Sequence, residues 1–356
     1  MHEDNPTFIS LPTKLTAGKK IYWKLKKTLY GLPESPQAFY DHVSLHLMSN
    51  GYTRTQSDPC VFYLRNGDNF TVCFVHVDDF AIAATSQELI DSFMVMMKTK
   101  YKIKVINELK GFLGMRIDYL TDGSIVLTQP AKIQEMLDEY NLQFFAGSLP
   151  TVPMSSTFSD EYQDDAEPVE FVKYMRFLGK LLFIIKTRPD IAYAVNRLAT
   201  RSVAPTHRDW QSLVRVALYL KGTIQMGIKF RRSESLNATA ATQLHCYVDA
   251  AFSCHSDSKS HTGYCFALGG LGGMFYSKSF KQDNTTLSST EAENAAAVEA
   301  AKEIKWFRDL LNELGFPQVE PTVVFADNSS MMTLAQNKNF LVTIRESNII
   351  YEESIF

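Results

Sequence analysis

The sequence predicts an α+β fold with two domains joined by a helical segment, and three observations predict it. Two apolar runs within residues 70–84 meet at a short acidic turn, as in an antiparallel hairpin. Residues 174–222 predict three helices, with Pro189 at the first turn of the second and Gly222 just past the third. After residue 240, three strand-like runs precede one long helix. With 356 residues, 45% of them hydrophobic, the chain can bury two cores.

The composition limits the classes of partner. The formal net charge is -3, so nucleic-acid binding would depend on local basic patches rather than on the charge of the whole chain. The five cysteines show no paired C-x-x-C spacing. We therefore expect reduced thiols and a cytoplasmic or nuclear location, not a disulfide framework or a zinc site. No apolar run reaches the length of a transmembrane helix, so we expect no membrane contact.

The acidic turn is the first candidate site. Asp78 and Asp79 stand between runs that are almost wholly apolar, and two strands joined at residues 77–79 would present both carboxylates at a hairpin tip. Two interpretations are open from these residues alone. Aspartate is common in turns because it forms hydrogen bonds with the local backbone. Carboxylates also bind Mg²⁺ together with phosphate oxygens and water.

Further elements are expected on both sides of this hairpin. Residues 37–49 predict an amphipathic helix that begins after Pro36, and lysines with interleaved aromatic residues make residues 14–27 strongly basic. Residues 86–98 predict a second helix. The lysines that alternate with other residues over 98–104 predict a strand. Each basic segment either contacts a nucleic-acid backbone or faces solvent.

The middle of the chain is expected to connect two domains. Residues 112–119 and 124–127 predict strands, and residues 129–140 predict a helix. Residues 155–170 are rich in Ser, Thr, Asp and Glu and predict a surface linker. Six basic residues of this part of the chain either contact a duplex backbone or belong to the core and the solvated faces of the helices, and we prefer the second interpretation. They are Arg188, Arg197, Arg201, His207, Arg208 and Arg215.

A second set of acidic residues lies after residue 240. A predicted strand over residues 244–250 carries Asp249 at its end, and a strand over 323–326 ends directly before Asp327. Two more strands are expected over 262–268 and 274–279.

The long helix of this region begins near a third acidic candidate. Ser288 and Glu291 form an S-x-x-E capping box for a helix that runs to about residue 314. Glu291 thus has two interpretations, as a helix cap and as a metal ligand beside Asp249 and Asp327.

Several motifs, in this order, resemble the Pol polyprotein of copia-type LTR retrotransposons, the Ty class. They are Leu25–Leu32, Ser35–Tyr40, Asn50–Tyr52, Ser57–Phe62, the Val77-Asp78-Asp79 turn, Gly111–Ile117, the segment Tyr174–Thr223, and the sequence Leu-Ser-Ser-Thr-Glu-Ala-Glu at Leu287–Glu293.

The resemblance implies a domain assignment. Residues 1–145 would be a partial reverse transcriptase fingers and palm, an antiparallel sheet with helices. Residues 146–235 would be a linker and helical connection, and residues 236–356 a ribonuclease H-like α/β domain. The implied partners are RNA, DNA and RNA–DNA hybrid, together with other retrotransposon polyprotein products.

The resemblance also implies two sites that use pairs of Mg²⁺ ions. Asp78 and Asp79 would hold metal in the palm. Asp249, Glu291 and Asp327 would hold metal in the ribonuclease H-like domain.

The chain departs from the family pattern at two places. The family has an earlier palm aspartate, and Met1 aligns just after it. The family also has His-Ile-Asp or His-Ile-Glu near the end, where residues 347–350 read Ser-Asn-Ile-Ile, with Glu352 or Glu353 as candidate substitutes. We therefore expect little or no polymerisation and impaired hydrolysis of hybrid RNA.

Three functions are compatible with these departures. The preferred hypothesis is an inactive relic. The alternatives are a working ribonuclease H on an inactive polymerase scaffold and a non-enzymatic nucleic-acid-binding protein.

Overall fold

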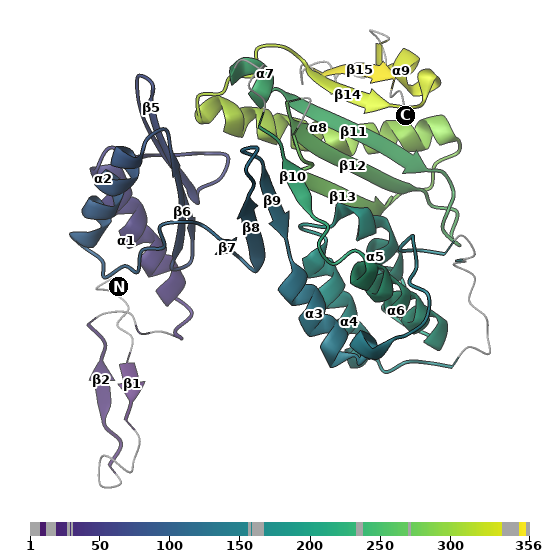
Figure 1. Cartoon of the computed structure of the whole chain (residues 1–356), viewed down its shortest axis with the longest axis horizontal. Helices are drawn as coiled ribbons and strands as arrows, with labels where there is room; N and C mark the ends of the chain where they lie inside the picture. The colour runs from purple at the N-terminus through teal and green to yellow at the C-terminus, as the bar shows by residue number, and fades with distance from the viewer. Residues whose placement is uncertain are drawn as a thin grey trace. The chain divides into compact units, whose positions relative to one another are not determined.

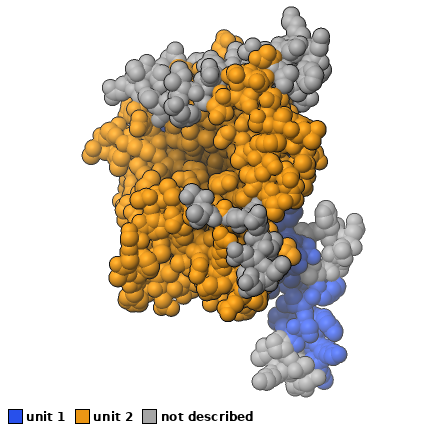
Figure 2. Space-filling model, turned by 90° about the vertical axis from the view of Figure 1, so that its right-hand side faces the viewer, with its two compact units in different colours: residues 1–107 blue, residues 108–356 orange. Residues whose placement is uncertain are grey.

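The fold is known from a computed structural model. It describes residues 8–11, 19–26, 29, 31–155, 158, 167–232, 238–269, 272–336 and 349–353. The chain divides into two compact units, residues 1–107 (unit 1) and residues 108–356 (unit 2), which are coloured separately in Figure 2. The division differs from the predicted one, which separates a palm from a connection at residue 145.

Unit 1 is built on a four-stranded antiparallel sheet in the order β3-β4-β5-β6. The strands are β3 (Thr53–Arg54), β4 (Val61–Asn66), β5 (Asn69–His76) and β6 (Asp79–Ala84). Helices α1 (Ser35–Ser49) and α2 (Gln87–Lys98) pack on it. A separate two-stranded ribbon pairs β1 (Phe8–Ser10) with β2 (Tyr22–Lys24).

The core of unit 1 forms because α1, α2 and the sheet each supply one apolar face. The buried side chains are Val43, Leu47, Tyr52, Phe62, Cys73, Val75, Phe93 and Met97. The predicted helices over residues 37–49 and 86–98 and the hairpin at residues 70–84 are thus confirmed.

The lysine-rich segment after α2 differs from its prediction. Residues 101–106 form no strand, and part of the basic stretch, at residues 12–18 and 27–28, lies outside the described residues. The alternation has a simpler cause. Tyr101 and Ile103 pack against the core of unit 1, while Lys102 and Lys104 are exposed.

The first part of unit 2 combines a small sheet with four helices. The antiparallel sheet has the order β10-β9-β8-β7. Its strands are β7 (Gly111–Phe112), β8 (Met115–Tyr119), β9 (Ile125–Thr128) and β10 (Ile228–Phe230). The helices are α3 (Pro130–Glu139), α4 (Phe171–Ile184), α5 (Ala192–Ala199) and α6 (His207–Gly222), with short 3-10 turns at Leu142–Phe144 and Pro189–Ile191.

These elements explain why unit 2 begins before residue 145. Strand β9 pairs with β10, a strand that follows α6 in the chain. Helix α3 shares one core with α4, α5 and α6, through side chains such as Ile133, Phe177, Leu198 and Leu213. The three helices predicted over residues 174–222 are confirmed.

Three arginines of this region lie inside the unit rather than on its surface. Arg188 is 1% exposed, and its guanidinium donates to both carboxylate oxygens of Asp190, at 2.9 and 2.7 Å, and to Thr223. Arg197 and Arg201 are also buried. A buried guanidinium needs such partners because an unpaired buried charge is costly. The core interpretation therefore holds for these three residues.

The second part of unit 2 is a five-stranded sheet in the order β13-β12-β11-β14-β15 (Figure 1). Its strands are β11 (Leu244–Ala251), β12 (His261–Leu268), β13 (Tyr276–Lys281), β14 (Thr322–Ala326) and β15 (Ile349–Glu353). The helices are α7 (Ala238–Thr242), α8 (Ser289–Glu313) and α9 (Ser329–Gln336). Strands β11, β12 and β13 are antiparallel, whereas β14 runs parallel to β11 and β15 parallel to β14. The predicted order of three strands, one long helix and a further strand is confirmed.

Helix α8 covers one face of this sheet. Its alanines at positions 296, 297 and 300 are buried against Cys246, Val248 and other apolar side chains of the strands. Small side chains permit a close approach of the helix, which places its first turns next to the strand ends. None of the helices in the described ranges has both the length and the apolar character that crossing a membrane requires.

We expect the Arg188–Asp190 pair to be a main support of the helical region. Asp190→Ala removes the carboxylate that also accepts from the Tyr219 hydroxyl at 2.7 Å, and leaves the buried guanidinium uncompensated. The expected loss is about 2–4 kcal/mol of unfolding free energy, measured by urea denaturation. Asp138→Ala, at an exposed helical position, is the control and should cost less than about 0.5 kcal/mol. Equal effects of the two variants would contradict the assignment.

Candidate metal centre

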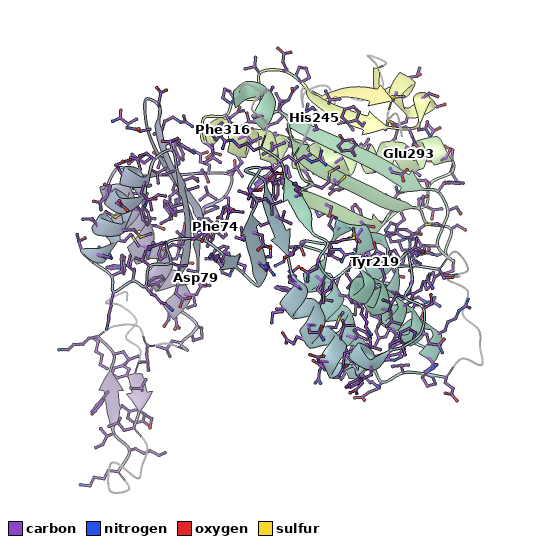
Figure 3. The ribbon with its side chains drawn as sticks, in the orientation of Figure 1. Phe74, Asp79, Tyr219, His245, Glu293 and Phe316 are labelled. Atoms are coloured by element: carbon purple, nitrogen blue, oxygen red, sulfur yellow. The ribbon has the colours of Figure 1, made fainter. Side chains whose placement is uncertain are left out.

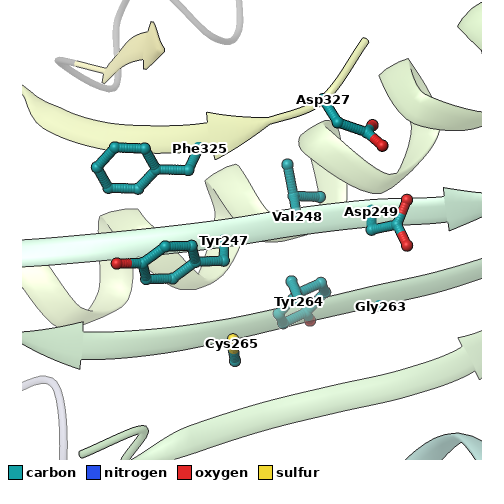
Figure 4. A pocket seen from close by; sticks show the side chains of 8 residues that line it. All are labelled: Tyr247, Val248, Asp249, Gly263, Tyr264, Cys265, Phe325 and Asp327. Carbon is teal, nitrogen blue, oxygen red and sulfur yellow. The ribbon is translucent and has the colours of Figure 1, made fainter. Parts of the chain in front are cut away.

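Three carboxylates from separate elements of unit 2 meet at one edge of its five-stranded sheet. Asp249 lies near the end of β11, Asp327 directly follows β14, and Glu293 lies in the second turn of α8. Each offers an oxygen within 4.8 Å of the others. Because β11 and β14 are parallel neighbours, their carboxyl ends fall at the same edge, where Figure 4 shows Asp249 and Asp327 side by side.

The glutamate of this cluster is Glu293, not the predicted Glu291. The Glu291 carboxylate accepts from the backbone N–H of Leu287 at 2.7 Å, and its own N–H donates to the Ser288 hydroxyl at 3.2 Å. Glu291 thus closes the start of α8, as the capping interpretation predicts. Residues two positions apart on a helix lie about 200° apart around its axis, so Glu293 faces the sheet where Glu291 cannot.

A signal for Glu293 was present in the sequence. Ala296, Ala297 and Ala300 follow Glu293 at spacings of three, four and seven, so all four residues share one helix face. The alanines are the residues that pack on the sheet. The helical period of the buried face would therefore have selected Glu293 over Glu291.

The environment of Glu293 disfavours its charged form. Its side chain, which is labelled in Figure 3, is 4% exposed, whereas the side chains of Asp249 and Asp327 are exposed. Burial, and then the negative charges of Asp249 and Asp327, raise the pKa of Glu293 to about 7, although a hydrogen bond from the Ala250 N–H to Oε1, at 3.2 Å, acts in the opposite direction. Three carboxylates this close are stable together only when a proton or a cation reduces their repulsion.

The donor set suits a hard divalent cation. All three residues offer carboxylate oxygens, the ligands that Mg²⁺ and Ca²⁺ prefer. Oε2 of Glu293 is buried and makes no hydrogen bond among the described residues. A buried acceptor without a donor is costly, and a bound cation would satisfy it.

The hairpin tip of unit 1 has a different character. Asp78 and Asp79 lie at the turn between β5 and β6, as predicted, and both are exposed. Val77 adopts a left-handed backbone conformation with φ of 54°, which is unusual for a β-branched residue and marks a constrained turn. Within the described part of unit 1, no third acidic, histidine or cysteine side chain gathers with these two.

The predicted fourth acid of the second site is only partly described. Ser347 and Asn348 lie outside the described residues. Glu352 and Glu353 belong to β15, where their backbones pair with Phe325 and Ala326. This register places residue 353 beside the end of β14 that leads to Asp327.

Comparisons with known proteins identify relatives of the whole chain. A sequence profile described as "Reverse transcriptase (RNA-dependent DNA polymerase)" matches residues 5–154. The Retrovirus-related Pol polyprotein from transposon RE1 of Arabidopsis thaliana is 31% identical over 329 residues, which are 92% of this chain and 22% of that protein. The corresponding polyprotein from transposon TNT 1-94 of Nicotiana tabacum is 31% identical and covers 94% of this chain and 25% of its own length.

A shorter relative and a solved structure agree with these matches. The putative transposon Ty5-1 protein of Saccharomyces cerevisiae is 27% identical over 85% of this chain and 96% of its own length. A foamy viral protease-reverse transcriptase, solved in complex with RNA/DNA hybrid, superposes with a TM-score of 0.51 at 13% identity, over 95% of this chain and 40% of that one. Because the sequence identity is only 13%, this structural similarity is evidence for the fold alone.

The chain thus spans about a fifth to a quarter of the plant polyproteins that it matches. Its motifs, its palm-like α+β fold and these relatives all indicate one family. The chain belongs to the copia-type retrotransposon reverse transcriptase family.

Proposed function

We propose that unit 2 hydrolyses the RNA strand of an RNA–DNA hybrid with divalent metal ions held by Asp249, Glu293 and Asp327. The observation that carries the proposal is the convergence of these three carboxylates, one of them buried with an unsatisfied oxygen. The strand order of the sheet supports it, because three antiparallel strands, a long helix and a parallel strand form the ribonuclease H arrangement. The foamy viral relative in fold was solved with RNA/DNA hybrid, which also supports this substrate class.

The cluster would act through charge. A divalent pair of this kind, when bound, polarises a phosphate and lowers the pKa of water. The role of the protein is to hold the three carboxylates in position. Asp249 and Asp327 are exposed and accessible to a phosphate group at the sheet edge, while the buried Glu293 is fixed by α8 and by the Ala250 N–H. Mg²⁺ is the cation we propose, because all the ligands are oxygens.

We do not propose DNA polymerisation for unit 1. The described residues of unit 1 present two carboxylates at an exposed hairpin tip, without a third one nearby. We propose that hydrolysis is slow, because residues 347–350 replace the His-Ile-Asp or His-Ile-Glu of the family pattern. An inactive or purely binding protein is the outcome that a negative assay would support.

Single substitutions in the cluster test hydrolysis directly. Asp249→Asn keeps the shape of the side chain and removes one charged ligand, so we expect at least a hundredfold slower cleavage of a labelled RNA–DNA hybrid with Mg²⁺ or Mn²⁺. Glu291→Gln is the control, since Glu291 only caps α8, and its activity should stay within about threefold. The proposal fails if the wild-type protein leaves the hybrid intact with either metal, or if cleavage survives Asp249→Asn.

The electrostatics of the cluster predict an unusual pH dependence of stability. The pKa of Glu293 in the folded protein, about 7, lies above its ordinary value of 4.5, so the unfolded state binds fewer protons between these values. Without metal, the stabilising contribution is complete below pH 4.5 and is lost as the pH rises through 7. Glu293→Gln stays neutral, and should raise the melting temperature at pH 8 by about 2–5 °C.

Added Mg²⁺ should change the stability of the wild-type protein but not that of Glu293→Gln. It should stabilise the wild-type protein at pH 8, by mass action, and leave Glu293→Gln nearly unchanged. Thermal melts at several pH values, with and without EDTA, measure both effects. Loss of stability in Glu293→Gln at pH 8 without metal would contradict the assigned repulsion.

A further inference from the structure

The open face of the five-stranded sheet, opposite α8, carries a row of residues that starts at the metal centre. In the registers of the strands, Asp249 on β11 pairs with Gly263 on β12, and Gly263 pairs with Ser279 on β13. Figure 4 shows Asp249 and Gly263 on their neighbouring strands. A carboxylate, a residue without a side chain and a hydroxyl therefore follow one another across the sheet.

This row lies at the bottom of a trough. A cavity of about 450 Å³ extends over Asp249, Gly263 and Ser279, and Pro189 and Tyr193 of the helical region form its wall. A second cavity of about 280 Å³ shares Asp249 and Gly263 and continues over β11 and β14. The larger volume falls within the range of about 300–1,000 Å³ that is usual for ligand sites.

Gly263 keeps the trough open, although its backbone does not require glycine. A Cβ at this position would meet only the carbonyl oxygen of Asp249, at 3.9 Å, and no left-handed φ is present. Glycine in the middle of a strand weakens the strand and often marks the close approach of a ligand. The fold therefore gives no reason for glycine here, whereas a ligand in the trough would.

Ser279 is held in place by two buried histidines. His261 is 2% exposed, and its Nε2 lies 2.8 Å from the Ser279 hydroxyl. His255 is 5% exposed, and its Nε2 lies 3.1 Å from Nδ1 of His261. The tautomers of the two rings decide the direction of this chain, so the hydroxyl can present either a donor or an acceptor to the trough.

Charge favours a neutral group as the occupant. Lys278 is the one lysine or arginine among the described residues that line the cavity, and its ammonium is paired with Glu303 of α8, at 2.7 Å, on the face of the sheet that α8 covers. The described lining therefore offers no cation to an anionic group in the trough. A sugar hydroxyl both donates and accepts, so it suits Ser279 whichever way the histidine chain runs, while a phosphate oxygen only accepts. Tyr193, 41% exposed, offers part of its ring as an apolar wall for a sugar.

We propose that this trough binds the ribose of an RNA nucleotide next to the hydrolysed phosphate, and that Ser279 recognises its 2′-hydroxyl. The inference rests on the proposed function, because it takes the carboxylate cluster as the place of hydrolysis. Ser279 is then a positioning residue that distinguishes RNA from DNA, since the 2′-hydroxyl is the group in which they differ.

Binding measurements test the subsite independently of hydrolysis. Fluorescence anisotropy, with Ca²⁺ as the divalent ion, compares an RNA–DNA hybrid with a DNA duplex of the same sequence. The preference is the dissociation constant for the DNA duplex divided by that for the hybrid. This ratio should be roughly fivefold to tenfold larger for the wild-type protein than for Ser279→Ala, which is the effect of one hydrogen bond. Ser212→Ala is the control, because it removes a hydroxyl of α6 that does not line the cavity and that donates to the carbonyl of Arg208, and it should keep the wild-type preference.

Gly263→Val separates a ligand role from a structural one. Valine is favoured in strands and its side chain projects into open space, so the melting temperature should not fall, while hybrid binding should weaken about tenfold or more. A structural role would reverse this pattern, with a lower melting temperature and unchanged binding.

The outcomes separate this inference from the proposed function. Cleavage that is normal in the wild type, with an unchanged hybrid preference in Ser279→Ala, overturns the subsite and leaves hydrolysis in place. Equal binding of hybrid and DNA duplex by the wild-type protein also overturns it. If the wild-type protein does not cleave the hybrid, but prefers it over the DNA duplex and loses this preference in Ser279→Ala, the result supports the subsite and contradicts hydrolysis.

Discussion

The buried carboxylate of Glu293, between two aspartates, is the constraint on which the second half of the molecule depends. Like charges at this distance oppose folding unless a proton or a cation offsets them. The surrounding packing must therefore supply enough free energy to hold α8 against the sheet. The alanine face of α8 and the apolar strands beneath it provide that packing, and they do so without a bulky side chain that would push the glutamate away from the strand ends.

The same constraint explains the arrangement of strands. Asp249 and Asp327 meet because β11 and β14 are parallel neighbours, although 78 positions separate the two residues in the chain. The long helix between these strands makes that parallel pairing feasible, and its first turns return to the edge where both strands end. The strand topology thus brings three acidic residues together that are distant in the sequence. Each of them needs only to lie near one end of its strand or helix.

Much of this arrangement was predictable from the sequence, and the failures have physical causes. Alternating apolar residues and turn residues predicted the hairpin at Asp78 and Asp79 and the strands that carry Asp249 and Asp327. The prediction named Glu291 because a capping motif and a family motif coincide at that residue, whereas the structure brings Glu293 into the carboxylate cluster, since Glu293 lies on the helix face that packs on the sheet. The lysine alternation over residues 98–104 reflects burial of Tyr101 and Ile103, not strand pairing, because backbone partners are a property of the tertiary fold.

The pairing of β9 with β10 has a practical meaning for dissecting the protein. These two strands join residues 125–128 to residues 228–230 across the whole set of helices. A fragment that starts at residue 146 would lose three of the four strands of that sheet, expose the edge of β10 and remove α3 from the helical core. A fragment meant to isolate unit 2 should therefore begin near residue 108, where no pairing between the described strands is interrupted.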